Sequence, residues 1–225
     1  MPAIRVWDLP TRLFHWSLAV CVTALIVTGS VGGGWMDWHF RLGYATLALL
    51  LFRLVWGFVG GYWSRFARFI PWPGAIVHYL KGQATPLDSL GHNPLGALSV
   101  YVMLLSLLAQ VVSGLFADDA ISYTGPLVAY AAEDTVSFAT WYHAEVGKPL
   151  LIALTALHLL AIVFYRLVRG QRLVAAMVHG DRQSDIGAPA SADGLRQRLG
   201  ALVLMAICAG IVWWLVSLDA SAGGY

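Results

Sequence analysis

Charged residues are scarce in this chain, where Asp, Glu, Lys and Arg together make up 12% of 225 residues. Soluble domains carry about 25%. Hydrophobic residues make up 59%, and the mean hydropathy is +0.69. So few charges exclude an ordinary soluble domain, and a formal net charge of only +2 gives no reason to expect a nucleic-acid partner. The composition instead predicts a membrane protein.

Cysteine is nearly absent as well. Cys21 and Cys208 both lie inside long apolar runs, where a thiol usually serves as a small packing residue, so no disulfide is expected. The sequence contains no Cys-x-x-Cys-His motif, which excludes a covalently attached c-type haem.

Long apolar runs are what the chain has in abundance. A helix that crosses about 30 Å of hydrocarbon needs about 20 mostly apolar residues. The first such segment contains a histidine and lacks a small-residue cleavage site, so we expect a retained helix and not a signal peptide. The sequence therefore predicts an all-α membrane protein with five spans, near residues 13–31, 42–60, 95–116, 149–168 and 199–218.

Basic residues predict how these spans are oriented. If five helices alternate in direction, every Lys and Arg except Arg41 and Lys148 lies on the side of the N-terminus. Such an excess marks the cytoplasmic side. We therefore expect a multi-pass protein of the bacterial inner membrane, with its N-terminus in the cytoplasm and its C-terminus in the periplasm.

Histidines fall into two pairs of matched depth in this topology. His15 and His158 each lie about ten residues inside flanking arginines, which places both in the cytoplasmic half at about 1.5 Å per residue. His39 precedes the second span and His143 precedes the fourth, both at the outer boundary. A haem iron bound between two facing helices needs one imidazole from each, so matched pairs of this kind are candidate haem ligands.

The fourth span supplies one histidine to each pair. His143 and His158 are fifteen residues apart, which corresponds to about 60° of rotation and about 22 Å of rise in an α-helix. Both can therefore face the same bundle interior. An interfacial histidine such as His39 or His143, taken alone, is more often a headgroup contact, whereas His158 in mid-membrane is a functional candidate by default. Zinc is the competing metal, but no cysteine or carboxylate cluster lies at the same depth.

Four segments now carry a resemblance to a known family. The chain resembles the bacterial cytochrome b561 and nickel-hydrogenase cytochrome b subunit family over residues 5 to 180. The shared features are Arg-x-x-His-Trp in the first helix, His-x-x-x-Gly at the second and two histidines in the fourth, in that order. The segments are VWDLPTRLFHWSLAVCVTALIVTG, HFRLGYATLALLLFRLVWGFVG, GHNPLGALSVYVMLLSLLAQVVSGLF and ALTALHLLAIVFYRLVRGQRLVAAMVHG.

The resemblance implies a four-helix transmembrane bundle that binds two b-type haems, followed here by a fifth helix. It implies a cytochrome domain over residues 5–180, with a linker and the fifth helix over residues 181–225. It also implies that the haem iron ligands are His15, His39, His143 and His158. In the family pattern the two histidines of the fourth helix are often one residue closer than they are here.

Several arginines and histidines near the ends of the predicted spans are candidates for supporting roles. Interfacial arginines such as Arg41, Arg53 and Arg166 suit haem propionates, although anchoring at the membrane surface is their commoner role. Asn93 and Pro94 resemble a helix N-cap and first turn, which makes the adjacent His92 structural, with a quinone or proton site as the alternative. His78 and His179 are expected to be solvated.

The predicted function is electron transfer across the membrane between the quinone pool and a periplasmic partner, either a c-type cytochrome or an oxidoreductase or hydrogenase subunit. Such a chain is an electron-transfer subunit of a respiratory oxidoreductase and not a free-standing enzyme. A carboxylate-rich outer loop favours a positively charged carrier. Two alternatives stay open: a stand-alone superoxide:quinone oxidoreductase and a haem-free membrane anchor. The loop carboxylates are Asp118, Asp119, Glu133, Asp134 and Glu145.

Overall fold

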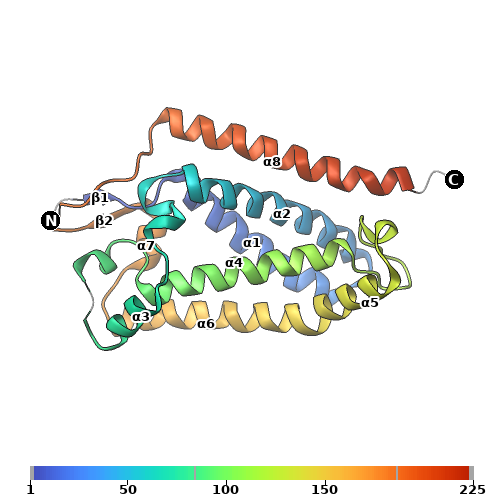
Figure 1. Ribbon diagram of the computed structural model, residues 1–225, viewed down its shortest axis with the longest axis horizontal. Helices are drawn as coiled ribbons and strands as arrows, with labels where there is room; N and C mark the ends of the chain where they lie inside the picture. Colours follow the sequence, from blue (N-terminus) through green and yellow to red (C-terminus); the bar gives the residue numbers. More distant parts are fainter. Residues whose placement is uncertain (1–2, 84, 186, 223–225) are drawn as a thin grey trace. The chain divides into compact units, whose positions relative to one another are not determined.

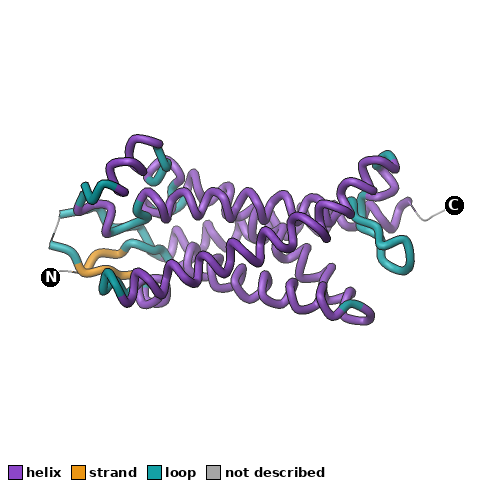
Figure 2. Tube along the Cα trace, turned by 90° about the horizontal axis from the view of Figure 1, so that it is seen from below, coloured by secondary structure: helices purple, strands orange, loops and turns teal. Residues whose placement is uncertain are grey.

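The computed structural model describes residues 3–83, 85–185 and 187–222, and most of them are helical (Figure 1; Figure 2). The long helices are α1 (Leu9–Val31), α2 (Met36–Val59), α4 (Pro94–Leu115), α6 (Lys148–Leu167) and α8 (Leu195–Ala222). The short helices are α3 (Pro73–Leu80), α5 (Glu133–Trp141) and α7 (Leu173–His179), and the strands are β1 (Ala3–Arg5) and β2 (Asp181–Gln183).

Among the described residues, five helical segments are long and apolar enough to cross a membrane, which confirms the five predicted spans. Large apolar side chains on them face outward, as Phe58 (72% exposed) and Leu105 (64% exposed) do. Such exposure suits contact with lipid and not with water. The all-α membrane fold predicted from the sequence is therefore confirmed.

Two helix boundaries differ from the expectation. α2 begins at Met36, so His39 lies inside this helix and not before it. The fourth span continues without a break from Glu133 to Leu167, because α5 joins α6 through a π-helical turn at Tyr142–Gly147. His143 therefore also lies inside a helix, although periodicity alone predicted a loop boundary near it.

The chain divides into two compact units, each built from three separate stretches of sequence. Unit 1 comprises the described residues of 1–16, 53–102 and 157–203. Unit 2 comprises those of 17–52, 103–156 and 204–225.

Asp8 organises the core of unit 1. Its carboxylate accepts hydrogen bonds from the backbone of Thr11, which caps the start of α1, and from the hydroxyl of Ser64 at 2.6 Å. It also accepts from the indole of Trp56 and from the backbone of Gly61. A fully buried carboxylate with four donors is compensated without a cation.

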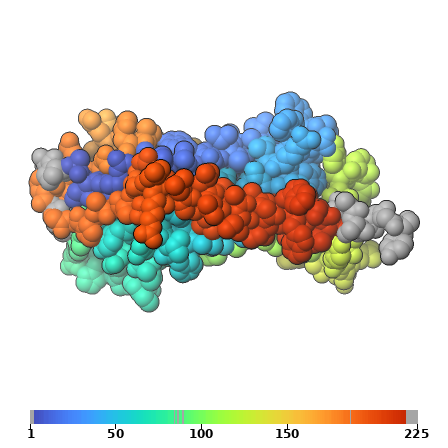
Figure 3. Space-filling model, turned by 90° about the horizontal axis from the view of Figure 1, so that it is seen from above, coloured from blue at the N-terminus to red at the C-terminus, as the bar shows by residue number. Residues whose placement is uncertain are grey.

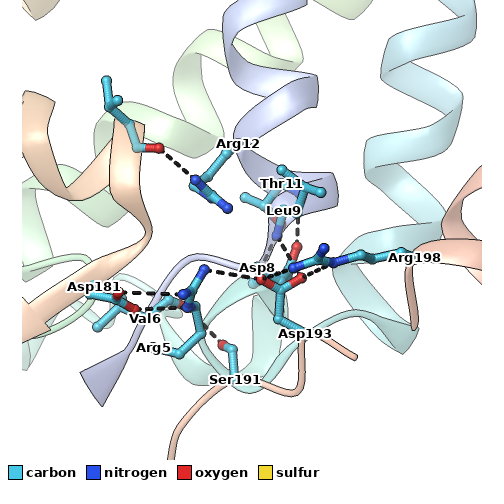
Figure 4. Close-up of polar contacts among 12 residues, drawn as sticks. Arg5, Val6, Asp8, Leu9, Thr11, Arg12, Asp181, Ser191, Asp193 and Arg198 are labelled. Atoms are coloured by element: carbon cyan, nitrogen blue, oxygen red, sulfur yellow. Dashed lines mark hydrogen bonds and ion pairs between the residues drawn. The ribbon is translucent and has the colours of Figure 1, made fainter. Parts of the chain in front are cut away.

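The segment between α7 and α8, expected to be a flexible linker, is anchored to the N-terminus (Figure 4). β2 pairs antiparallel with β1, with Ile4 opposite Arg182. The carboxylate of Asp193 accepts hydrogen bonds from Arg5, Arg198 and the backbone of Leu9. The segment is therefore held at these contacts, which link positions about 180 residues apart, beyond the reach of any local pattern.

Unit 2 has an aliphatic core contributed by four of the long helices. Leu50 of α2, Leu107 of α4, Leu151 of α6 and Val212 of α8 are all buried in one cluster. The opposite side of α8 is exposed, as Trp213 at 76% shows, and Figure 3 shows side chains of this helix, coloured orange to red, at the surface. α8 thus belongs to the packed fold.

Candidate functional site: two pairs of facing histidines

The first histidine pair lies in unit 1. His15 of α1 and His158 of α6 face each other with ring centroids 6.4 Å apart and ring planes inclined by 51°. Both side chains are half-buried. His15 also packs edge-on against Trp16, with centroids 5.2 Å apart.

The second pair lies in unit 2. His39 of α2 and His143 of the π-turn face each other with ring centroids 6.0 Å apart and planes inclined by 83°. Both of these side chains are also half-buried. The structure thus brings the four predicted ligands together in the two pairs that the depth argument gave.

The separation within each pair suits one metal ion between two imidazoles. A metal–nitrogen bond is about 2 Å and the ligating nitrogen lies about 1.1 Å from its ring centre, so two rings on opposite sides of one metal have centres about 6 Å apart. The observed 6.4 Å and 6.0 Å match this value. Each facing pair could therefore hold the iron of a haem, which takes imidazole ligands in many proteins.

Backbone carbonyls fix the protonation of the unit 2 pair. The Nδ1 of His39 donates to the carbonyl oxygen of Leu25 at 3.1 Å, and the Nδ1 of His143 donates to that of Gln110 at 2.9 Å. A neutral imidazole that donates from Nδ1 keeps the lone pair of Nε2 free. Each ring therefore presents Nε2 as a metal ligand and is held by a second hydrogen bond, as metal-binding histidines usually are.

Glycines make room for both rings of unit 2. A Cβ atom on Gly29 would lie 2.8 Å from Cε1 of His39, and one on Gly114 would lie 2.8 Å from Cε1 of His143. No side chain fits at either position without displacing the imidazole. Each of these glycines therefore lies directly against the imidazole of a histidine on another helix.

The two glycines belong to a repeated local motif that sequence reasoning missed. α1 carries LIVTG at 25–29 and α4 carries QVVSG at 110–114. In both motifs the carbonyl four residues before the glycine accepts from the histidine, and the hydroxyl of Thr28 or Ser113 lies 3.3 Å from the same Nδ1. A hydroxyl residue followed by glycine, present in both apolar helices, is the sequence pattern that could have indicated these histidine contacts.

The π-turn changes the spacing at which the two fourth-span histidines can face one side of the helix. A π-turn takes up one residue more than an α-helical turn, and such turns are frequent at functional sites. Because the turn spans Tyr142–Gly147, His143 occupies about the place that residue 144 would have in an uninterrupted helix. The extra residue between His143 and His158 is thereby absorbed, and His143 still faces His39.

A cavity of about 280 Å³ lies against the second pair within unit 2. Apolar residues such as Val22, Leu107 and Leu151 line most of it. Its polar lining includes His39 and His143 together with Gln110, Asp118, Asp119 and Lys148. Concave, mostly apolar sites with a few convergent polar groups are typical of cofactor binding.

Residues 6–180 match the family model described as prokaryotic cytochrome b561. The chain belongs to the prokaryotic cytochrome b561 family. It is 28% identical over 218 residues to a protein of Azotobacter vinelandii named probable Ni/Fe-hydrogenase B-type cytochrome subunit, covering 80% of this chain and 88% of that protein. A protein of Escherichia coli K12 named probable Ni/Fe-hydrogenase 1 B-type cytochrome subunit is 24% identical over 217 residues, covering 81% of this chain and 92% of that protein. No solved structure gives a significant match.

Membership confirms the family resemblance and makes the chain a b-type membrane cytochrome. A b-type cytochrome carries haem b and serves electron transport, and the five apolar helices fit the inner membrane. Within the part of the chain that the structure describes, no three His, Cys, Asp or Glu side chains gather around a common point. The facing pairs are thus the arrangement that suits the b561 cofactor.

Three other predicted side chains, those of Arg41, His78 and His179, are exposed. Arg41, a candidate propionate partner, is exposed and stacks over Trp38 with its guanidinium carbon 5.4 Å from the ring centre. His78 and His179 are exposed, as expected. Asn93 does cap α4, since its Oδ1 accepts from the backbone of Gly96 at 2.7 Å.

Proposed function

We propose that this cytochrome passes electrons across the bacterial inner membrane through two b-type haems, one held by His15 and His158 and the other by His39 and His143. The observation that carries the proposal is the presence of two facing imidazole pairs with ring centres 6.4 Å and 6.0 Å apart. Bound haem would supply a one-electron iron couple at each pair. All four histidines lie within residues 5–180, which we propose as the cytochrome domain.

The residues of unit 2 do three things for such a cofactor. His39 and His143 present Nε2 because their Nδ1 atoms are engaged with carbonyls. Gly29 and Gly114 hold the rings in place. The mostly apolar lining would surround such a cofactor with a medium less polar than water, which limits the reorganisation that each electron transfer requires.

We propose that the electron partners lie on opposite sides of the membrane. In this proposal His15 and His158 lie in the cytoplasmic half, near a quinone or quinol site, and His39 and His143 lie toward the periplasm. The alternation of the spans and the distribution of Lys and Arg support it. The relatives are named as hydrogenase cytochrome subunits, so the periplasmic partner is an oxidoreductase subunit of that kind or a c-type cytochrome. The chain itself then acts as an electron-transfer subunit.

Haem stoichiometry in purified variants tests the ligand pairs. The wild type should carry two haems per chain. His15→Ala and His158→Ala should each remove one haem, and it should be the same one, whereas His39→Ala and His143→Ala should remove the other. His78→Ala and His179→Ala serve as controls because both side chains are exposed. The pairing is wrong if substitutions at His15 and His39 remove the same haem.

Spectra and a quinol assay test the electron path. A reduced-minus-oxidised spectrum without a haem signal would show a haem-free anchor and refute the proposal. Quinol added to proteoliposomes should reduce the haem of His15 and His158 before that of His39 and His143. Quinone reduction driven by superoxide without any partner protein would instead show a stand-alone oxidoreductase.

A further inference from the structure

Buried nitrogen atoms without hydrogen-bond partners gather in unit 1. Among the described residues, five buried side-chain polar atoms have no partner, and the four nitrogens of this set all belong to unit 1. Buried polar groups in proteins are nearly always paired, so each exception requires an explanation. Four nitrogens in one unit indicate an acceptor that the chain itself does not supply. They are Arg12 Nε, His15 Nδ1, Arg53 Nη1 and His92 Nδ1.

Arg53 is the strongest case because it is a buried cation. Its side chain is only 4% exposed, and its guanidinium carbon lies 4.5 Å from the centre of the Phe66 ring. Gly57, one turn later on α2, lets Phe66 pack against the helix, since a Cβ atom there would collide with that ring. Stacking on an aromatic ring compensates a buried charge only in part.

Asp8, Asp181 and Asp193 of unit 1 are engaged with other groups. Asp8 acts on Arg53 only at longer range, because hydrogen bonds from four other groups occupy its carboxylate. The ion pairs formed by described residues of the unit join Arg5 or Arg198 to Asp181 or Asp193. None of these pairs involves Arg53.

His92 is packed close to this arginine. It lies between Trp7 and Phe69, with ring centroids 4.7 Å and 4.5 Å away. Phe69 in turn contacts Phe66, the ring beneath Arg53, at a centroid distance of 5.8 Å. Burial, followed by the charges of Arg53, Arg182 and His15, lowers the pKa of His92 to about 3. His92 is therefore a neutral donor within electrostatic reach of both the buried arginine and the first histidine pair.

We propose that Arg53 and His92 form the carboxylate-binding site for the propionates of the haem held by His15 and His158. Arg53 pairs with one propionate through its free Nη1, and His92 donates an N–H hydrogen bond to the carboxylates. A planar guanidinium suits a carboxylate better than an ammonium does, and a paired arginine no longer carries an uncompensated buried charge. The inference rests on the proposed haem-carrying function and concerns one of the three arginines that the sequence suggested. Arg41, two residues after His39 in α2, stays a candidate partner for the other haem.

Redox titration of the purified protein tests the site. Arg53→Gln removes a positive charge beside one haem. A nearby positive charge favours the reduced iron, so without it the midpoint potential of this haem should fall. The expected shift corresponds to at least a tenfold change in the redox equilibrium, about 59 mV for one electron. The haem of His39 and His143 should not shift. Arg68→Gln is the matched control, because Arg68 also lies in unit 1 and stacks on an aromatic ring, Tyr62 at 4.2 Å, but is exposed.

Esterified haem separates a propionate contact from a general effect of charge. After apoprotein is reconstituted with the dimethyl ester, the difference between wild type and Arg53→Gln should shrink to less than half. An undiminished difference would overturn the proposal, because a free anion or a lipid phosphate would then be what Arg53 binds. If the purified wild type, before any reconstitution, carried no haem, the proposed function itself would be refuted.

His92→Phe keeps the inference testable if Arg53→Gln does not fold. Phenylalanine preserves the packing against Trp7 and Phe69 but cannot donate a hydrogen bond. The variant should keep two haems per chain and lower the potential of the same haem only. An unchanged potential in His92→Phe would overturn the assignment of His92, and unchanged potentials in both variants would overturn the site.

Discussion

Gln110 and His143 are joined by two hydrogen bonds that run in opposite directions. The side-chain Nε2 of Gln110 donates to the backbone oxygen of His143 at 2.9 Å, and the ring Nδ1 of His143 donates to the backbone oxygen of Gln110 at 2.9 Å. α4 therefore holds both the backbone of the π-turn and the orientation of the ring that projects from it.

Gln110→Ala should weaken haem binding at His39 and His143 by about 10–100-fold, the usual cost of losing a partner that orients a metal ligand. This substitution removes only the hydrogen bond from the Gln110 side chain to the backbone of His143. The haem of His15 and His158, in unit 1, should stay bound. Haem per chain after dilution in detergent measures the effect. Gln83→Ala, at an exposed position in unit 1, is the control, and equal haem loss in both variants would contradict this role.

Gly29→Ala and Gly114→Ala should each displace one imidazole of the same pair, because the new methyl group would lie 2.8 Å from its Cε1. We expect loss of one haem per chain in either variant and a normal spectrum from the haem of His15 and His158. Gly210→Ala is the matched control in unit 2, since a Cβ atom there meets no atom within 4 Å. Two retained haems in Gly114→Ala would show that the π-turn can shift to accommodate the methyl group.

Neutralising the carboxylates of the loop before α5 and of its first turn should slow electron exchange with a positively charged periplasmic partner about tenfold at low salt. The effect should vanish at high salt, since the Debye length is about 10 Å at 0.1 M. Asp119 keeps its charge in mild acid because the backbone N–H groups of Tyr123, Ser122 and Ile121 lower the pKa of its carboxyl. Stopped-flow haem oxidation measures the rate. The variant combines Asp118→Asn, Asp119→Asn, Glu133→Gln and Asp134→Asn.

A neutral quinol provides the control for this experiment, because its reaction should depend neither on salt nor on the four substitutions. A protein partner whose rate is equally indifferent would dock elsewhere or be a permanently bound subunit held by apolar contacts.

The anchor at Asp193 should make stability fall in acid. Burial alone would raise the pKa of this carboxyl, but hydrogen bonds from Arg198 and Leu9 and the charges of Arg198 and Arg5 lower it below 3.8 overall. A lowered folded-state pKa means that the stabilisation is present above pH 3.8 and is lost as pH falls through the folded value. Thermal unfolding of Asp193→Asn should therefore show a lower midpoint at pH 7 and a smaller decrease in acid. Asp185→Asn, at an exposed position of the same segment, should unfold like the wild type.

Much of the fold followed from local sequence. Five apolar segments of about 20 residues predicted five spans because a helix must satisfy its own backbone hydrogen bonds in lipid. Pairing His15 with His158 and His39 with His143 needed only helical rise and alternation of direction. The cap of α4 at Asn93 was likewise readable, because its partner is three residues away.

Other features depended on contacts between distant segments. Gln110 and Gly114 contact His143 from another helix, and nothing in a hydropathy pattern distinguishes them from packing residues. The burial of Arg53 on Phe66 and the anchoring of Asp193 at β1 likewise join residues that no local periodicity relates. The sequence by itself determined which segments are helices and which histidines share a depth, because both depend on hydrogen bonds and rise within one helix. Only the tertiary structure decided which carbonyl, glycine or cation each histidine meets, because that depends on how one helix is rotated against its neighbours.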